Sequence, residues 1–144
     1  MTVQLVDINV LVALFWTNHE QHAAARKWFQ SLQDRWATCP LTQAGFVRIS
    51  SNPRVFPDAP SVGRAAEVLA ANLKHPRHLF WRDDLTFADA VAPFGGRVAS
   101  HQQTTDAYLF GLALHRRGML TTFDAGVAAL ADSRQRRSLN LLAV

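Results

Sequence analysis

Short apolar runs alternate along the chain with longer segments in which apolar residues recur at helical spacing. The short runs predict strands and the longer segments predict helices. Strands are predicted at residues 3–7, 36–39, 78–81, 119–122 and 139–144. Helices are predicted at residues 9–15, 20–32, 42–49, 62–73, 86–92, 106–117 and 125–131. This alternation is typical of an α/β protein with a central parallel sheet of four or five strands and helices on both faces.

Polar residues and one glycine mark the ends of several predicted helices. Ser61, Thr42 and either Thr104 or Thr105 are placed to cap the helices that follow them. Gly118 is placed to close the helix at 106–117. The helix after Ser61 is expected to bury one face, formed by Val62, Ala65, Ala66, Leu69, Ala70 and Leu73.

The size and composition of the chain narrow its class. With 144 residues, no repeat and no low-complexity tract, we expect one domain over residues 1–144. The longest apolar runs fall short of a membrane span, and the first residues lack the features of a secretory signal. The single cysteine, Cys39, excludes an internal disulfide and a cysteine zinc cage. These features favour a protein of the reducing cytoplasm.

The charge balance points to a polyanionic partner. The chain carries 15 basic and 11 acidic residues, a net charge of +4, and 13 of the basic residues are arginines, whose planar donors suit phosphate. A genomic bias in composition explains the same numbers equally well. The run Arg134, Arg136 and Arg137 is either a solvated turn or an RNA-backbone contact. His19 and His22 are expected to face solvent, with a phosphate or partner contact as the alternative.

Three aspartates are candidates for one site. Asp7 and Asp124 each follow a short apolar strand, and ligands of open parallel sheets bind at the carboxyl ends of the strands. Asp106 lies in the first turn of the most apolar helix, where the helix dipole favours a carboxylate. Taken alone, Asp106 is also typical of a helix start, and Asp124 of a turn or N-cap. Asp7 is harder to explain structurally, because a carboxylate in an apolar run is costly unless it is paired or metal-bound.

A cluster of these acids would need a cation. Two carboxylates about 4 Å apart repel by roughly 4 kcal/mol at an effective dielectric of 20. A divalent ion removes that repulsion, and all-oxygen ligands select Mg²⁺ or Mn²⁺ over zinc. Such an ion suits phosphodiester hydrolysis, since it activates water and neutralises developing charge.

Four segments resemble, in order, the motifs of the PIN-domain family, and specifically of its VapC-type toxins. They are residues 5–14 (LVDINVLVAL), 36–49 (WATCPLTQAGFVRI), 104–109 (TTDAYL) and 120–124 (LTTFD). Each motif alone is weakly specific, but the four occur in family order over nearly the whole chain.

The resemblance implies a Mg²⁺- or Mn²⁺-dependent endoribonuclease that is the toxin of a toxin–antitoxin system. It implies an RNA substrate, a cognate antitoxin protein as partner, and frequent homodimers. Residue by residue, it implies that Asp7, Asp106 and Asp124 are metal ligands and catalytic residues, and that Asn9 and Thr122 are neighbours that orient water or a ligand. Gln43 stands where the family commonly has a glutamate, so it would offer a neutral oxygen to the metal.

Two other functions remain open. One is a structure-specific nuclease of the same fold, although such proteins are generally longer. The other is a degenerate PIN module that binds RNA or an antitoxin without cleaving, which Gln43 favours and the three aspartates oppose. For the toxin, we expect the antitoxin to fill a basic groove around the acidic site and to insert an arginine among the three aspartates.

Overall fold

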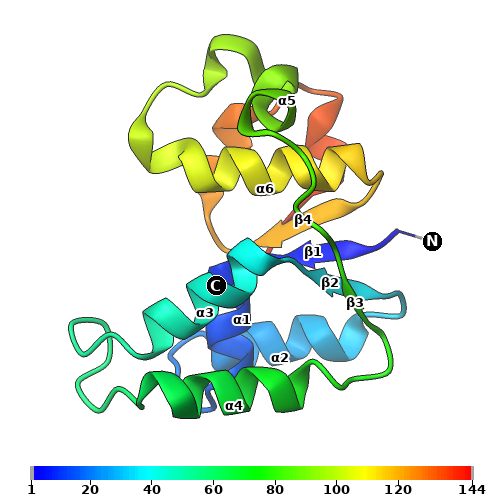
Figure 1. The fold of residues 1–144 in the computed structure, drawn as a ribbon. Helices are drawn as coiled ribbons and strands as arrows, with labels where there is room; N and C mark the ends of the chain where they lie inside the picture. The colour runs from blue at the N-terminus through cyan, green and yellow to red at the C-terminus, as the bar shows by residue number, and fades with distance from the viewer. Residues whose placement is uncertain (1, 144) are drawn as a thin grey trace.

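The computed structural model describes residues 2–143 and contains a parallel sheet with strand order β3-β2-β1-β4-β5 (Figure 1). The strands are β1 (Gln4–Val6), β2 (Trp36–Thr38), β3 (His78–Phe80), β4 (Met119–Thr122) and β5 (Leu139–Leu141). Each pair of neighbours is parallel, which confirms the predicted sheet. The last strand was predicted to reach Val144, which lies outside the described residues.

Helices cover both faces of the sheet, as predicted. The α-helices are α1 (Ile8–Phe15), α2 (His22–Ser31), α3 (Pro40–Ser50), α4 (Val62–Asn72), α5 (Phe87–Val91) and α6 (Thr104–His115). The short 3-10 helices are η1 (Ala92–Arg97), η2 (His101–Gln103), η3 (Ala125–Leu130) and η4 (Gln135–Ser138). Figure 1 shows α5 and α6 on one side of the sheet and α1 to α4 on the other. Between residues 2 and 143, no helix is long and apolar enough to cross a bilayer.

The two faces bury separate apolar clusters, and β1 contributes to both. Successive side chains of a strand point to opposite faces. Leu5 therefore packs with Phe94 and Phe110 on the α6 side, while Val6 packs with Trp36 and other residues on the α1 side. Both strand residues are fully buried. The double coverage explains why β1 places an apolar residue on each face, Leu5 in one cluster and Val6 in the other.

The register of β1 and β4 places their carboxyl ends side by side. Val6 is paired with Thr121, and the Asp7 N–H donates to the Thr121 carbonyl at 2.9 Å. The residues that follow this pair, Asp7 and Thr122, are therefore level at one edge of the sheet.

Two predicted helix starts were wrong. α3 begins at Pro40 with Cys39 as its N-cap, and Thr42 instead bonds back to the Cys39 backbone N–H at 3.0 Å. Proline is tolerated in the first helical turn because the N–H it lacks has no partner there. α6 begins at Thr104 rather than at Asp106, because the 3-10 turn η2 runs directly into it.

The end of α6 also differs from the prediction in its details. The left-handed position is taken by Arg117 (φ 57°) rather than by Gly118. Arg117 and Gly118 donate backbone bonds to the carbonyls of Leu114 and Ala113, which is the Schellman pattern. Gly118 is needed for space instead, since a Cβ there would lie 2.6 Å from both the Trp81 ring and the Val3 carbonyl oxygen.

The buried face of α4 is narrower than predicted. Ser61 is the N-cap, as expected, and its hydroxyl accepts from the Arg64 N–H at 3.0 Å. Of the predicted face only Ala65 and Leu69 are buried, and Val62 is 62% exposed. α4 packs on α3 and α1 with one stripe, so its remaining small apolar residues face outward.

Candidate active site

The candidate site lies where the strand order reverses. From β1 the chain builds β2 and β3 on one side of the sheet and β4 and β5 on the other. In sheets of this kind the ligand crevice lies outside the carboxyl ends of the strands at that point. Asp7 directly follows β1, and Asp124 lies two residues beyond the end of β4. The fold thus brings the first and last candidate acids to the same edge.

Asp7 is a buried, hydrogen-bonded carboxylate. It is the N-cap of α1 and only 4% exposed. Its Oδ1 accepts from the Ile8 N–H at 2.7 Å, and its Oδ2 accepts from the Thr122 hydroxyl at 2.7 Å. Burial raises the pKa of Asp7, the two hydrogen bonds lower it, and the charge of Asp124 raises it further. Both oxygens are therefore fixed in direction by donors from the chain itself.

Thr122 and Asn9 join the start of α1 to the end of β4. The Thr122 hydroxyl donates to Asp7 and accepts from the Asn9 side-chain amide at 3.3 Å and from the Asp124 N–H at 3.0 Å. The Asn9 side-chain oxygen accepts from the Phe123 N–H at 3.3 Å. These contacts place Asn9 and Thr122 beside the predicted acids. The Thr122 hydroxyl uses its proton and both lone pairs, which locks the orientation of Asp7.

The charges of the other two acids act on Asp106. It lies in the first turn of α6 and is half-buried. Burial, the charges of Asp7 and Asp124, and hydrogen bonding with the Asp124 side chain together raise its pKa from 3.8 to about 7. This electrostatic effect places all three acids within range of one another. Near neutral pH, Asp106 carries a proton about half of the time.

Asp124 is exposed and has a local structural role. It is the N-cap of η3, and its side-chain Oδ1 accepts from the Gly126 N–H at 2.8 Å. The N-cap interpretation of this residue is therefore correct. It does not exclude a second role, because one carboxylate has several acceptor positions and the Gly126 bond uses only one of them.

The donor set fits a hard cation, but the ligands are not assembled as they stand. Carboxylate oxygens are the donors that Mg²⁺ and Mn²⁺ prefer. Within residues 2–143, however, no group of three or more His, Cys, Asp or Glu side chains is arranged to hold a metal ion. The pKa of Asp106 is raised first by burial and then by the charges of Asp7 and Asp124, so a cation at this site would favour its ionised form.

Gln43 contacts the neighbouring strand. Its side-chain N–H donates to the Thr38 hydroxyl at 3.0 Å, and that hydroxyl lies 2.7 Å from Nε2 of His78. Gln43 lies near the start of α3, as predicted, but it lines neither of the hollows that the aspartates line. Its role toward a metal stays a prediction.

Two hollows meet at Asp106. The first, of about 270 Å³ and named here the Asp7 hollow, is lined by Asp7, Ile8, Asn9, Val12, His19, Arg48, Ile49, Val55, Phe56, Thr105 and Asp106. The second, of about 430 Å³ and named here the Asp124 hollow, is lined by Ala99, Ser100, Gln102, Gln103, Asp106, Asp124, Gly126, Val127 and Leu130. Asp106 is the residue that the two linings share, with Asp7 in one hollow and Asp124 in the other.

Sequence reasoning missed Arg48 and undervalued His19. Both line the Asp7 hollow. His19 is half-buried, with Nδ1 accepting from the Gln21 N–H at 3.0 Å, and burial lowers its pKa. His22 also faces the protein, since its Nδ1 donates to the Ala13 carbonyl at 2.8 Å. The predicted solvent-facing positions were therefore wrong for both histidines. Arg48 lies about one and a half helical turns after Gln43, and this spacing does not predict that its side chain lies near the acids.

The expected basic groove around the acids was also wrong. Among the residues that line the two hollows, Arg48 and His19 are the basic ones. Two other arginines bind carbonyl groups of the chain: Arg77 binds the Leu32 carbonyl, and Arg97 donates at 2.7 Å to the carbonyl of Leu130, a residue that lines the Asp124 hollow. Arg136 and Arg137 lie on η4 and are exposed. Val12, Ile49, Val55 and Phe56 make one wall of the Asp7 hollow apolar instead.

Comparison with known proteins gives one consistent result. The PIN domain family model matches residues 5–133. Over 141 residues the chain is 44% identical to ribonuclease VapC38 of Mycobacterium tuberculosis, covering 97% of this chain and 98% of the relative. It is 45% identical over 130 residues to ribonuclease VapC39 of the same species, covering 90% and 91%.

Two solved structures share the fold. Mycobacterium tuberculosis VapC20, a sarcin-ricin loop cleaving toxin, superposes with a TM-score of 0.63 at 17% identity, covering 88% of this chain and 93% of that one. FitAcB from Neisseria gonorrhoeae gives a TM-score of 0.56 at 20% identity, covering 88% and 92%. At these identities the likeness concerns the fold alone.

Proposed function

The chain belongs to the PIN domain family, and on that premise we propose that it is a divalent-metal-dependent endoribonuclease, the toxin of a toxin–antitoxin pair. The observation that carries the proposal is the coupling of Asp7, Asp106 and Asp124 at the carboxyl edge of the sheet. The ribonuclease activity follows from relatives more than 40% identical over nearly the whole chain, which are named as ribonucleases.

Asp7, Asp106 and Asp124 would hold a Mg²⁺ or Mn²⁺ ion. Once bound, such an ion supplies an activated water and neutralises negative charge on the phosphodiester. Assembly of the three ligands requires Asp106 to lose its proton and Asp124 to use oxygen lone pairs beyond the one bonded to Gly126. The proposal therefore couples metal affinity to the protonation of Asp106.

The chain's own residues position the ligands and the substrate. Thr122 and Ile8 each donate a hydrogen bond to one oxygen of Asp7. The Asp7 side chain is therefore already ordered, and it loses little conformational entropy when a ligand binds. Asn9 keeps Thr122 in place and ties α1 to the loop after β4. Arg48 offers planar donors to an RNA phosphate in the Asp7 hollow. Because three ionised carboxylates repel phosphate, the proposal places both a cation and Arg48 near the acids.

A test of the reaction compares RNA cleavage by the purified wild-type chain in Mg²⁺ or Mn²⁺, in EDTA, and in EDTA followed by each metal. Cleavage is expected with Mg²⁺ or Mn²⁺, none in EDTA, and recovery on re-addition without any need for zinc. Full activity in EDTA would contradict the metal mechanism and point to a histidine base. An inactive control preparation, Asp7→Asn, separates this activity from a contaminating ribonuclease.

For the partner, we propose an antitoxin segment that occupies the Asp7 hollow. The apolar wall formed by Val12, Ile49, Val55 and Phe56 suits apolar side chains, and the adjacent acids suit one basic side chain that displaces the metal. The exposed Val55 (46%) allows a test by Val55→Asp, which should weaken the complex. Val62→Asp is the matched control, because Val62 is exposed on α4 and lies outside the hollow. A complex that leaves Mn²⁺ affinity unchanged would contradict this placement.

A non-cleaving PIN module is the second candidate. It is favoured by the absence, among residues 2–143, of a ready group of three metal-binding side chains, and by Gln43 in place of a charged residue. The EDTA and re-addition experiment decides between the two. RNA binding without cleavage in any metal would favour the second candidate.

The homodimer and the cytoplasmic location remain proposals based on the family resemblance. Light scattering of the purified chain tests the dimer, with twice the chain mass expected. The buried Cys39, whose pKa burial raises, is a poorly reactive thiol that suits a reducing compartment.

A further inference from the structure

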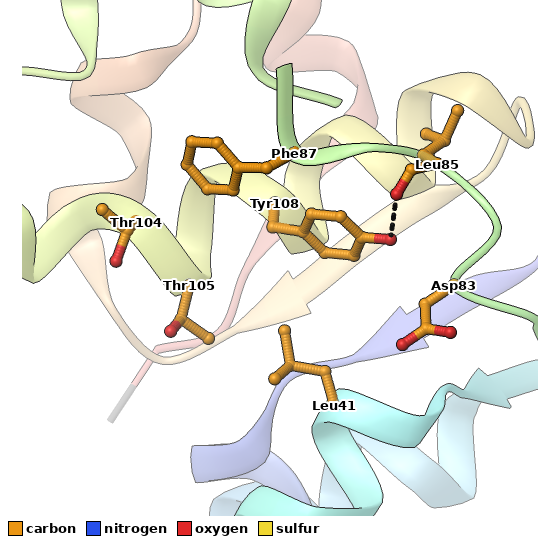
Figure 2. Close-up of a pocket in the computed structure, with 7 residues that line it drawn as sticks. All are labelled: Leu41, Asp83, Leu85, Phe87, Thr104, Thr105 and Tyr108. Atoms are coloured by element: carbon orange, nitrogen blue, oxygen red, sulfur yellow. Dashed lines mark hydrogen bonds between the residues drawn. The ribbon is translucent and has the colours of Figure 1, made fainter. Parts of the chain in front are cut away.

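A third hollow adjoins the candidate site across the first turn of α6. It has a volume of about 470 Å³ and is named here the Tyr108 pocket. It is lined by Leu41, Asp83, Leu85, Phe87, Thr104, Thr105 and Tyr108 (Figure 2). Thr105 lines both the Tyr108 pocket and the Asp7 hollow. Since Asp106 follows Thr105 directly, the pocket begins one residue away from the candidate catalytic acids.

The pocket combines flat apolar walls with polar groups at its two ends. Figure 2 shows the rings of Phe87 and Tyr108 above the side chain of Leu41, with Asp83 at one end and Thr104 and Thr105 at the other. Phe87 is 48% exposed, so part of its ring is open to a ligand. Unstacked bases of single-stranded RNA bind such rings by stacking and use their Watson–Crick edges for hydrogen bonds.

The charge of the pocket favours a base over a phosphate. None of its lining residues, all of them within the described chain, is basic, and Asp83 is a carboxylate. A phosphate there would be repelled, whereas a neutral base with N–H donors would be attracted. Asp83 and Tyr108 line the same pocket, and Figure 2 shows the Asp83 carboxylate on the side to which the Tyr108 hydroxyl points. The carboxylate is therefore close to the ring on which a base would stack.

Two residues of α6 and its C-cap, Tyr108 and Arg116, hold the loop that carries Asp83 in place. Arg116 donates to the Arg82 carbonyl at 2.8 Å and to the Asp84 carboxylate at 3.2 Å. The Tyr108 hydroxyl donates to the Leu85 carbonyl at 3.0 Å. Asp83 thus lies between anchored residues on both sides. A preorganised acceptor of this kind discriminates between ligands, because a wrong ligand leaves it unpaired.

We propose that the Tyr108 pocket binds the base of a nucleotide that flanks the cleaved phosphodiester and that Asp83 selects guanine there. The proposal rests on the ribonuclease function proposed above. Guanine presents two adjacent donors, N1–H and the N2 amino group, which match the two oxygens of a carboxylate. Adenine and cytosine each present one amino donor next to a ring nitrogen that accepts, and uracil presents one donor between two carbonyl oxygens. Each of these three bases would place an acceptor against Asp83.

The test compares cut sites in a randomised RNA for four proteins: wild type, Asp83→Asn, Phe87→Ala and the control Asp89→Asn. Asp89 is an exposed carboxylate on α5 that does not line the pocket. Wild type and Asp89→Asn are expected to show guanine at one position beside the cut. Asp83→Asn should lose about tenfold of that preference, the value of one bidentate contact to a base. Phe87→Ala should slow cutting about tenfold whatever the base, because it removes stacking.

Inosine substitution tests the contact itself. Inosine lacks only the N2 amino group of guanine. Wild type should cut an RNA with inosine at the flanking position about tenfold more slowly than one with guanine. Asp83→Asn should cut the two RNAs at nearly equal rates, so the effects of the two changes should not add.

The outcomes separate this inference from the function beneath it. If the wild type cuts RNA and Asp83→Asn keeps the same flanking preference, the base pocket is wrong and the ribonuclease stands. If Asp83→Asn or Phe87→Ala alters the oligomeric state and leaves the flanking base unchanged, the pocket belongs to contacts with a second copy of the chain. If the wild type cuts no RNA with either metal, the proposed function fails, and this inference fails with it.

Discussion

The two regions that supply the candidate acids are built in opposite ways. At the ends of β1 and β4, Asp7 is buried and both of its oxygens accept hydrogen bonds from Ile8 and Thr122. At the start of α6, Asp106 is half-buried, and its pKa of about 7 reflects burial and the charges of Asp7 and Asp124. Burial raises the pKa of both acids, but at the sheet edge two directed hydrogen bonds lower the pKa of Asp7 again, whereas at the helix start the causes acting on Asp106 all raise its pKa.

The difference assigns distinct tasks to the two regions. A carboxylate fixed by donors keeps its direction whether or not a ligand is present. A carboxylate with a raised pKa gains the most from a cation, because the cation replaces the proton and cancels the repulsion. We therefore expect substitutions of the acids in either region to lower cleavage, and those at the helix start to change stability and its pH dependence as well.

The largest effect is expected from Asp7→Asn. The change removes one ligand charge from the fixed region, and cleavage should fall at least about a hundredfold, since the metal supplies several kcal/mol of stabilisation. The fold should persist, because the amide has nearly the same shape. Its NH₂ group would face the Thr122 hydroxyl, which already accepts two bonds, so little stability is gained from loss of the charge. Cleavage assays and circular dichroism measure both results, and undiminished cleavage would remove Asp7 from the site.

The next largest effect on cleavage is expected at Thr122, and its neighbour on β4, Thr121, serves as the control. Thr122→Val removes the donor to Asp7 and should lower cleavage by about 10- to 100-fold, as loss of a group that orients a metal ligand does. Thr121→Val is the matched control. Thr121 is equally buried on β4, but its hydroxyl donates to the Gln4 side chain at 2.6 Å on the other face of the strand. Thermal melting should show losses for both variants, whereas cleavage should fall only for Thr122→Val; equal losses of cleavage would contradict the orienting role.

The helix start should show itself in the pH dependence of stability. The ordinary pKa of an aspartate, which applies to the unfolded chain, is 3.8, and that of Asp106 in the folded protein is about 7. Between these values the folded state holds a proton that the unfolded chain has released, so stability without metal falls as the pH rises through this window. The cost is fully present above the folded pKa. Asp106→Asn removes it.

Melting curves in EDTA test this account of Asp106. At about pH 8 Asp106→Asn should melt several degrees above wild type, and at about pH 4 the two should melt together. Added Mn²⁺ should reverse the order at about pH 8, because it stabilises only the protein that retains the ligand. A constant difference between the two proteins at every pH would show that Asp106 is not strained by its neighbours.

The smallest effect is expected at Gln43. Gln43→Glu adds a charge on α3, outside both regions, where the present amide donates to Thr38. We expect Mn²⁺ to bind a few-fold more tightly, an effect of about 1 kcal/mol after repulsion by the other acids is subtracted. Calorimetric titration of both proteins measures it. Identical affinities would show that position 43 does not face the metal.

The sequence predicted the sheet and the acids at its edge because both depend on local patterns. A buried parallel strand is a continuous apolar run, and the residue after it lies at the carboxyl edge. Asp7, a charged residue directly after such a run, could therefore be predicted as a site residue. The neighbours Asn9 and Thr122 came from the family resemblance, since the bond between them joins residues 113 positions apart.

The errors arose where contacts between distant segments decide the outcome. The arginines suggested a basic groove, but Arg77 and Arg97 bind carbonyls far away in the chain. The burial of His22 depends on the Ala13 carbonyl of the preceding helix. Val62 has the spacing of a core residue on α4, yet the helix packs with a narrower stripe. Periodicity shows which residues share a face and not how much of that face is covered.

The most direct test of the central claim is a calorimetric titration of the wild-type chain with Mn²⁺ at about pH 6.5, in two buffers with different enthalpies of ionisation. If Asp7, Asp106 and Asp124 together hold the ion, binding should release most of a proton from Asp106, whose pKa is about 7. The same titration of Asp106→Asn should show weaker binding without that proton. Equal affinity and equal proton release in the two proteins would contradict a metal site that contains Asp106.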